Sequence, residues 1–148
     1  MTQEEKDLLL KDLSARLPYG VKISIPDLWT QQREIEILDE IFKGDDELYR
    51  VNSKGQCIEH IKPYLFPLSS MTEEQREELH ELWDFNMSAA LDCAIYGDES
   101  KSGLHQLTAA KKVNEWCYEN HFDINGLIPM ELANDATGLN IYTNYDNN

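Results

Sequence analysis

The chain is poor in basic residues. Lysine and arginine together number 13 of 148 residues, against 28 aspartates and glutamates, so the formal net charge is −15. A surface this negative repels nucleic-acid phosphates, and it also repels membrane surfaces, which are themselves anionic. We therefore expect no direct contact with nucleic acid or membrane. The partner favoured by this charge is a basic protein surface, for example that of a nucleic-acid-handling protein.

Cysteines and long apolar runs are also scarce. Cys57, Cys93 and Cys117 are an odd number at wide spacing, which is a poor disulfide framework and fits thiols kept reduced inside a cell. The opening residues 2–6 lack the basic-plus-apolar pattern of a secretion signal, and no apolar run is long enough to cross a bilayer. We expect a cytoplasmic protein.

The first part of the chain predicts one helix followed by short strands. A capping box at Thr2–Glu5 begins a helix over residues 3–15. Its apolar residues recur at spacings of three and four, so one face should pack, while charged residues such as Asp12 should stay in water. Residues 21–25 alternate between apolar and polar, which is typical of a half-buried strand.

The following segments predict a small sheet. Residues 32–43 fit both a strand and a helix, and we favour a strand from the context. Further strands are predicted at residues 47–52 and 57–61, with turns at residues 44–46 and 52–55. Together they indicate a small antiparallel sheet or partly open barrel, with the first helix laid across it.

Residues 61–75 join this part to a helical part. Pro63 and Pro67 cannot donate to a sheet ladder and disfavour helix before them, so the backbone should run extended and then stop. A second capping box at Thr72–Gln75 then begins a long helix that ends near Tyr96, where residues 97–100 should break it. A third helix is predicted over residues 104–120.

These elements predict a single α+β domain. Residues 1–68 form the helix and the small sheet, residues 69–142 form an acidic half built on two helices, and residues 143–148 form a frayed tail. The second half is the more acidic, because residues 69–148 carry −11 of the net charge and residues 1–68 carry −4. The apolar positions expected to be buried in the two long helices are Leu79, Leu82, Trp83, Met87, Ala90, Leu91, Ala94, Ile95, Leu107, Ala110, Val113, Trp116 and Cys117.

Three segments, 17–21, 61–75 and 121–128, occur in this order along nearly the whole chain. Together they resemble a family of uncharacterised proteins encoded by phages, prophages and mobile elements of gut anaerobic bacteria. The resemblance implies a phage or mobile-element origin and a place in a bacterial host cell, with no established activity. The chain departs from the usual family form at Phe66, where a basic residue often stands, and at Ile124-Asn125, where an aromatic-basic pair often stands.

Acidic residues cover the solvent side of the predicted second helix. They are Glu73, Glu74, Glu77, Glu78, Glu81 and Asp84. Like charges four residues apart on a helix each cost a few tenths of a kcal/mol. Such a face can be merely solvated, but we favour a surface kept for a basic partner, in a protein-interaction module without enzymatic activity or cofactor. In one version, its carboxylates occupy a site that would otherwise bind nucleic-acid phosphates.

The sequence is also compatible with two other functions. A small-ligand protein that binds or sequesters a nucleotide would need basic groups for the phosphates, and Lys111, Lys112 and Trp116 are the cluster available in the helical half. A zinc module could use Cys57, His60, Cys117 and His121, which have the ligand types of a tetrahedral site. On a strand, however, a separation of three residues places side chains on opposite faces, so buried cysteines are the competing interpretation.

Two single residues also need an interpretation. His121 beside Asp123 could be an oriented general base. The alternative is that His121 ends the third helix while Asp123 or Asn125 shapes the next turn, and we favour it because no matching nucleophile is recognisable. We expect no catalytic residue. Among the tryptophans, Trp29 lies between polar residues and is the candidate for an exposed aromatic side chain.

Overall fold

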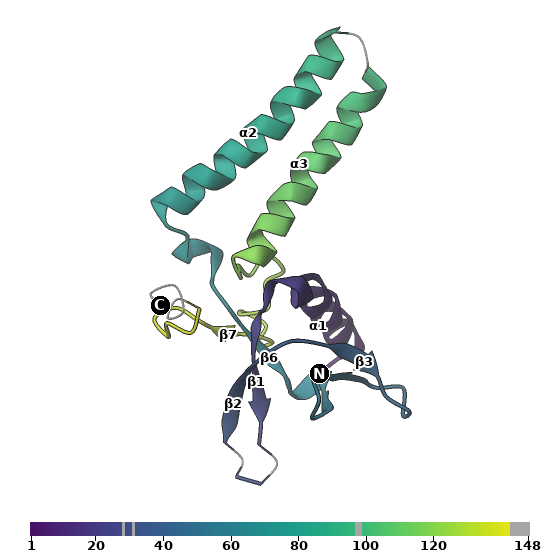
Figure 1. Ribbon diagram of the computed structural model, residues 1–148, viewed down its shortest axis with the longest axis vertical. Helices are drawn as coiled ribbons and strands as arrows, with labels where there is room; N and C mark the ends of the chain where they lie inside the picture. The colour runs from purple at the N-terminus through teal and green to yellow at the C-terminus, as the bar shows by residue number, and fades with distance from the viewer. Residues whose placement is uncertain (28, 31, 97–98, 143–148) are drawn as a thin grey trace.

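The computed structural model describes the backbone of residues 1–27, 29–30, 32–96 and 99–142, and the side chains of these residues outside 86–107. The helices are α1 (Gln3–Arg16), α2 (Glu73–Tyr96) and α3 (Glu99–Glu119), and the short 3-10 turns are η1 (Leu17–Tyr19), η2 (Ile58–His60) and η3 (Leu68–Ser70). The strands are β1 (Lys22–Pro26), β2 (Arg33–Ile37), β3 (Ile41–Lys43), β4 (Tyr49–Val51), β5 (Gln56–Cys57), β6 (Lys62–Leu65) and β7 (Asn134–Asp135). The fold class is α+β, as the sequence predicts (Figure 1).

The helix α1 begins and packs as its sequence predicts. The Thr2 hydroxyl accepts from the Glu5 amide at 3.1 Å, and the Glu5 carboxylate accepts from the Thr2 amide at 2.8 Å, so the capping box is present. Leu9 and Leu13 are fully buried against the sheets. The chain then leaves the helix through η1 and turns at Gly20, whose φ of 68° favours glycine.

The strands form two small sheets. One has four strands in the order β2-β1-β6-β7, and the other has three in the order β3-β4-β5. Every pair is antiparallel except β6 and β7, which run parallel and join the two halves of the chain. Within the described part of the chain, neither sheet closes into a barrel. The main core lies where α1 covers these sheets (Figure 1).

Residues 32–43 form strands, as favoured, but residues 57–61 do not. The predicted strand over residues 57–61 is wrong, because β5 ends at Cys57 and the chain turns through η2. This turn buries Ile58 in the main core. The last strand before the helical half is instead β6, where Pro63 pairs with β1 alone, because β7 pairs only with Tyr64 and Leu65. A proline is tolerated where a strand lacks a partner on one side.

The helices α2 and α3 form an antiparallel hairpin that extends away from the body (Figure 1). The capping box predicted at the start of α2 is present, because the Thr72 hydroxyl accepts from the backbone N–H of Gln75 and the Gln75 side-chain oxygen accepts from the backbone N–H of Thr72. The start predicted for the third helix is too late, since α3 already includes Glu99 and Ser100. Residues 97–98 and 143–148, and the predicted buried side chains from Met87 to Ile95 and at Leu107, lie outside the described part.

The base of the hairpin is held by a second apolar cluster. Its buried members are Trp116, Cys117 and Phe122, and its partly buried members are Phe66, Met71, Leu79, Leu82, Val113 and Ile124. Two predictions about buried side chains are wrong here. Ala110 is exposed while Ala109, four residues before Val113, is fully buried on the packed face of α3, and Trp83 is 39% exposed at the edge of the hairpin.

Helix α3 ends in a Schellman motif that anchors it to the body. The amide of Phe122 donates to the Cys117 carbonyl at 2.8 Å, and that of His121 donates to the Tyr118 carbonyl at 3.1 Å. His121 has a φ of 64°, the left-handed conformation this motif requires. The Phe122 ring stacks on Trp116 at 5.7 Å between ring centroids, so the helix end and the apolar cluster stabilise each other.

Candidate functional site

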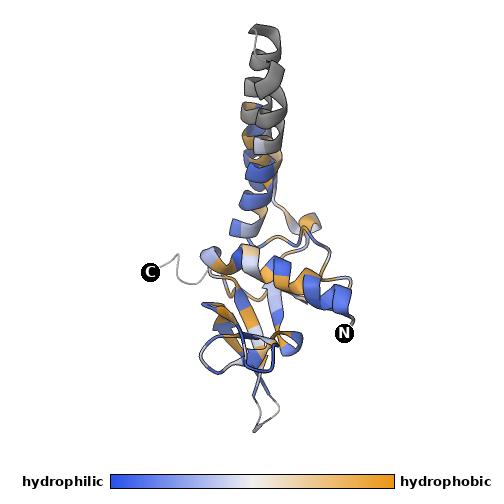
Figure 2. Ribbon diagram, turned by 90° about the vertical axis from the view of Figure 1, so that its right-hand side faces the viewer, coloured by the Kyte–Doolittle hydropathy of each residue, from blue (hydrophilic) through white to orange (hydrophobic). Residues whose placement is uncertain are grey.

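The acidic residues of α2 form one continuous surface. Glu73, Glu74, Glu77, Glu78, Glu81 and Asp84 are all exposed. At 3.6 residues per turn they fall within an arc of about 140° around the helix axis. In the described part of the chain, none of these carboxylates makes an ion pair with a lysine or arginine. We call these six residues the acidic surface of α2. Figure 2 shows much of the described base of the hairpin in blue, the hydrophilic colour.

One member of the acidic surface also contacts α3. The Trp116 indole N–H donates to the Glu78 carboxylate at 3.1 Å. Glu78 lies at the edge of the acidic arc, where α2 faces α3, and its hydrogen bond fixes the orientation of the surface relative to the hairpin. The other five carboxylates point to solvent without such a contact to a described residue.

An exposed phenylalanine lies at the C-terminal end of the acidic surface. Phe85 is 77% exposed, and on an ideal helix it points in a direction between those of Glu74 and Glu78, one turn beyond Glu81. The sequence pattern did not single out this residue, because it lies off the apolar stripe of the helix. The signal that could have found it is its place directly after an acidic position, off that stripe. The surface therefore has an apolar contact beside its negative charges.

The opposite side of α2 carries a different feature. A shallow hollow of about 390 Å³ is lined by Met71, Arg76, Leu79, His80, Trp83 and Val113. These α2 residues lie outside the acidic arc, although His80 borders it at Glu77 and Asp84. The hollow therefore lies on a different face of α2 and includes the basic side chain of Arg76.

The residues proposed for nucleotide binding do not form one site. Lys111 and Lys112 are exposed on α3, and Lys112 lies 3.7 Å from the Glu115 carboxylate. Trp116 is only 7% exposed, because its ring is stacked in the apolar cluster and its N–H is bound to Glu78. A base cannot stack on this ring unless the cluster opens, and two exposed lysines alone offer no enclosed phosphate site.

The zinc site proposed from the sequence is not formed. Within the part of the chain that the structure describes, no group of three or more His, Cys, Asp or Glu side chains is arranged to hold a metal ion. Cys57 and His60 lie at β5 and η2, whereas Cys117 and His121 lie at the end of α3. Cys117 is buried, and this burial raises the pKa of its thiol although Arg16 partly opposes the change.

His121 and Asp123 take structural positions, as the favoured alternative predicts. The Asp123 carboxylate accepts from the amides of Leu127 at 2.8 Å and Ile128 at 2.9 Å, so it shapes the turn after α3. The His121 ring stacks on Tyr142 at 3.9 Å between centroids. Burial, followed by the positive charges of Arg16 and Lys22, lowers the pKa of His121 to about 4, so the imidazole is neutral at pH 7.

The prediction that Asp12 stays in water is wrong. Asp12 and Arg16 are both 0% exposed and form an ion pair of 2.6 Å beneath α1. The Arg16 guanidinium also donates to the Phe122 carbonyl at 2.6 Å, and the side-chain amide of Asn125 donates to the Asp12 carboxylate at 2.9 Å. This network ties α1 to the turn that follows α3, so Asn125, one of the departures from the family form, has a structural role.

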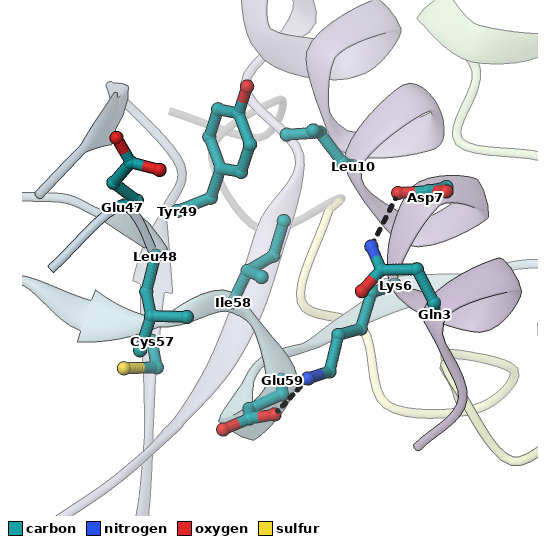
Figure 3. A pocket seen from close by; sticks show the side chains of 10 residues that line it. All are labelled: Gln3, Lys6, Asp7, Leu10, Glu47, Leu48, Tyr49, Cys57, Ile58 and Glu59. Atoms are coloured by element: carbon teal, nitrogen blue, oxygen red, sulfur yellow. Dashed lines mark hydrogen bonds and ion pairs between the residues drawn. The ribbon is translucent and has the colours of Figure 1, made fainter.

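A small cavity lies between α1 and the three-stranded sheet (Figure 3). Its volume is about 150 Å³, below the range of about 300–1,000 Å³ that is typical of small-ligand sites. Two pairs of its polar side chains bind each other, Lys6 with Glu59 at 3.1 Å and Gln3 with Asp7 at 2.9 Å. Lys6 is the one basic residue in its lining, so the cavity offers no second cation to bind a phosphate.

Comparisons with protein-family models, with curated proteins and with solved structures give no match to this chain. No relative therefore assigns a role to the acidic surface of α2, and the resemblance to phage and mobile-element proteins stays a prediction. Of the helices in the described ranges, none combines the length and the apolar character needed to cross a membrane.

Proposed function

We propose that this chain is a non-enzymatic protein-interaction module that binds a basic protein surface through the acidic surface of α2. The observation that supports it is that six carboxylates share one exposed arc, with Phe85 at its C-terminal end and no basic ion-pair partner in the described residues. Uncompensated charge of one sign increases the association rate with an oppositely charged surface and selects against other partners. The hairpin extends from the body, which leaves this surface accessible (Figure 1).

The chemistry of the surface defines the partner further. The partner presents lysines or arginines spaced along a surface that can face a helix, together with an apolar site for the Phe85 ring. Nucleic-acid-handling proteins carry such basic surfaces, so the carboxylates would occupy positions that otherwise bind phosphates. In this proposal the protein acts in the cytoplasm of a bacterial host and derives from a phage or mobile element.

The test compares two variants with the same change in net charge. One variant neutralises Glu73, Glu77, Glu81 and Asp84 as the corresponding amides, and the control neutralises Glu4, Glu40, Asp45 and Glu131, which are exposed on the body. Proteins captured on the immobilised wild-type chain should bind the first variant at least about tenfold more weakly and the control nearly as well as wild type. Binding to wild type should also weaken steeply between low and high salt.

Two outcomes of this comparison would contradict the proposal. Equal loss in both variants would mean that net charge alone attracts the partner, and the acidic surface of α2 would lose its assigned role. Binding that persists unchanged at high salt would contradict the proposal outright. If the partner handles nucleic acid, an added duplex should compete with the wild-type chain for it, because both would bind the same basic surface.

A further inference from the structure

Strand β2 is a free edge of the four-stranded sheet, because it pairs with β1 alone (Figure 1). The hydrogen bonds just beyond both ends of the β1–β2 ladder show which residue pairs in it share backbone hydrogen bonds and which do not. Asp27 donates to the Gln32 carbonyl at 2.7 Å, and Leu38 donates to the Val21 carbonyl at 2.9 Å. In an antiparallel ladder, hydrogen-bonded pairs alternate with pairs that share no backbone hydrogen bond. Counting inward from the two ends gives the same assignment for β2.

This assignment places Arg33, Ile35 and Ile37 in the pairs without hydrogen bonds. Their backbone N–H and C=O groups therefore point away from β1, toward the open edge. Pro26, which has no N–H, lies opposite Arg33 in such a pair, in agreement with the assignment. The Ile37 carbonyl accepts from the side-chain amide of Asn52 at 2.8 Å and retains a second lone pair.

The residues whose backbone groups point outward also include the exposed apolar side chains of β2. Ile35 is 48% exposed and Ile37 is 54% exposed, and both lie on one face of the strand. An edge strand that combines unpaired backbone groups with exposed apolar side chains favours pairing with another strand. The edge carries no proline or bulge in residues 33–37 that would prevent this pairing.

The charges at this edge are largely compensated, unlike those of the chain as a whole. Lys54 lies 3.0 Å from the Glu34 carboxylate and 3.3 Å from that of Glu36, and it also interacts with the nearby Asp27 carboxylate. Arg33 donates to the Ser24 carbonyl at 3.1 Å and to the His60 carbonyl at 2.8 Å, which holds its side chain against the sheet. Two basic groups therefore offset two of the three carboxylates here, so a second copy of this acidic chain meets less repulsion at this edge than the net charge of the chain would give.

We propose that a second copy of this chain pairs with β2 in an antiparallel arrangement, with the two-fold axis at Ile35. Ile35 then lies opposite Ile35 of the second copy, and Arg33 lies opposite Ile37, so all outward backbone groups of β2 find partners. The same patch serves both copies, as closed two-fold symmetry requires. Glu34 faces Glu36 of the second copy, and the two lysines at position 54 compensate these charges. The two four-stranded sheets become one continuous sheet.

The primary test measures the molecular mass of the full chain by sedimentation equilibrium over the micromolar range, for wild type and two variants. Ile35→Pro removes an outward N–H and leaves the N–H groups that donate to β1, whereas Ile35→Val retains the outward N–H while also shortening the side chain and is the control. Wild type and Ile35→Val should dimerise, and Ile35→Pro should dimerise at least about tenfold more weakly. A wild-type chain that stays monomeric throughout this range overturns the proposal, and so does undiminished dimerisation of a folded Ile35→Pro variant.

A second pair of variants decides the case if Ile35→Pro does not fold. Lys54→Gln leaves Glu34 facing Glu36 without compensation, so dimerisation should weaken, while Lys11→Gln makes the same charge change at an exposed position of α1 and should not weaken it as much. Equal effects of both would contradict pairing at this edge. Added salt should strengthen the dimer, because it screens the repulsion between two chains of −15. Salt should instead weaken partner binding through α2. The dimer proposal and the proposed function can therefore fail independently of each other.

Discussion

The buried Asp12–Arg16 pair gives the sharpest prediction for individual residues. Asp12→Ala leaves the Arg16 guanidinium buried without a counter-charge, and breaking a buried pair in this way costs about 3–5 kcal/mol of unfolding free energy. Urea unfolding followed by circular dichroism measures this loss. The double variant Asp12→Leu with Arg16→Met removes both charges and should recover most of the loss. A single variant as stable as wild type would contradict the ion pair.

Asp12 also illustrates what the sequence could and could not predict. The helix, its capping box and its apolar stripe follow from local spacing and were predicted correctly. The burial of Asp12 depends on Arg16 one turn later and on Asn125 more than a hundred residues away, so it depends on tertiary contacts. The spacing of four residues between opposite charges was visible in the sequence, but such pairs usually lie in solvent.

For single helices and strands, the features set by local sequence were predicted, and the features set by contacts between distant residues were not. Both capping boxes and the strand character of residues 32–43 agree with the structure. The turn at η2 and the parallel pairing of β6 with β7 did not follow from the pattern, because burial of Ile58 and a contact between residues 64 and 134 decide them. In the candidate site, the acidic residues were predicted, but the exposure of Phe85 beside them was not.

The anchored end of α3 predicts a pH dependence. His121 has a pKa of about 4 in the folded chain, because burial and the charges of Arg16 and Lys22 disfavour its protonated form. Its ordinary value is about 6.5, so the unfolded chain binds more protons between these values. Stability from this residue is therefore complete above about pH 6.5 and is lost as the pH falls toward 4. Between pH 7 and pH 5 the loss should reach about 2 kcal/mol.

The measurement compares wild type with His121→Asn in urea unfolding at both pH values. Asparagine tolerates the left-handed backbone of position 121, whose φ is 64°, and it carries no titratable group. The carboxylates of the chain titrate equally in both proteins, so the difference between the two slopes isolates the histidine. The variant should lose less stability on acidification. Identical slopes for the two proteins would refute the assigned burial of His121.

At the scale of the whole molecule, charge is unevenly distributed between two regions. The edge of β2 is only weakly acidic, since Arg33 and Lys54 offset two of the three carboxylates of Asp27, Glu34 and Glu36, whereas the acidic surface of α2 makes no ion pair with a basic residue in the described part. Self-association and partner binding would therefore use separate surfaces with opposite salt dependence. A dimer would also present two acidic surfaces at once, which raises the avidity for a partner with repeated basic sites.

The uncompensated charge should also lower the stability of the folded chain. Self-repulsion among groups totalling −15 opposes the compact state, and salt screens it, with a Debye length of about 10 Å at 0.1 M. The thermal unfolding midpoint should therefore rise with sodium chloride, mostly below about 0.2 M. The variant neutralised at Glu73, Glu77, Glu81 and Asp84 should start from a higher midpoint and gain less from salt. The four-site control on the body should fall between the two, because its acids are less crowded. If the α2 variant instead gains as much from salt as wild type, the acidic surface is not where the repulsion is concentrated.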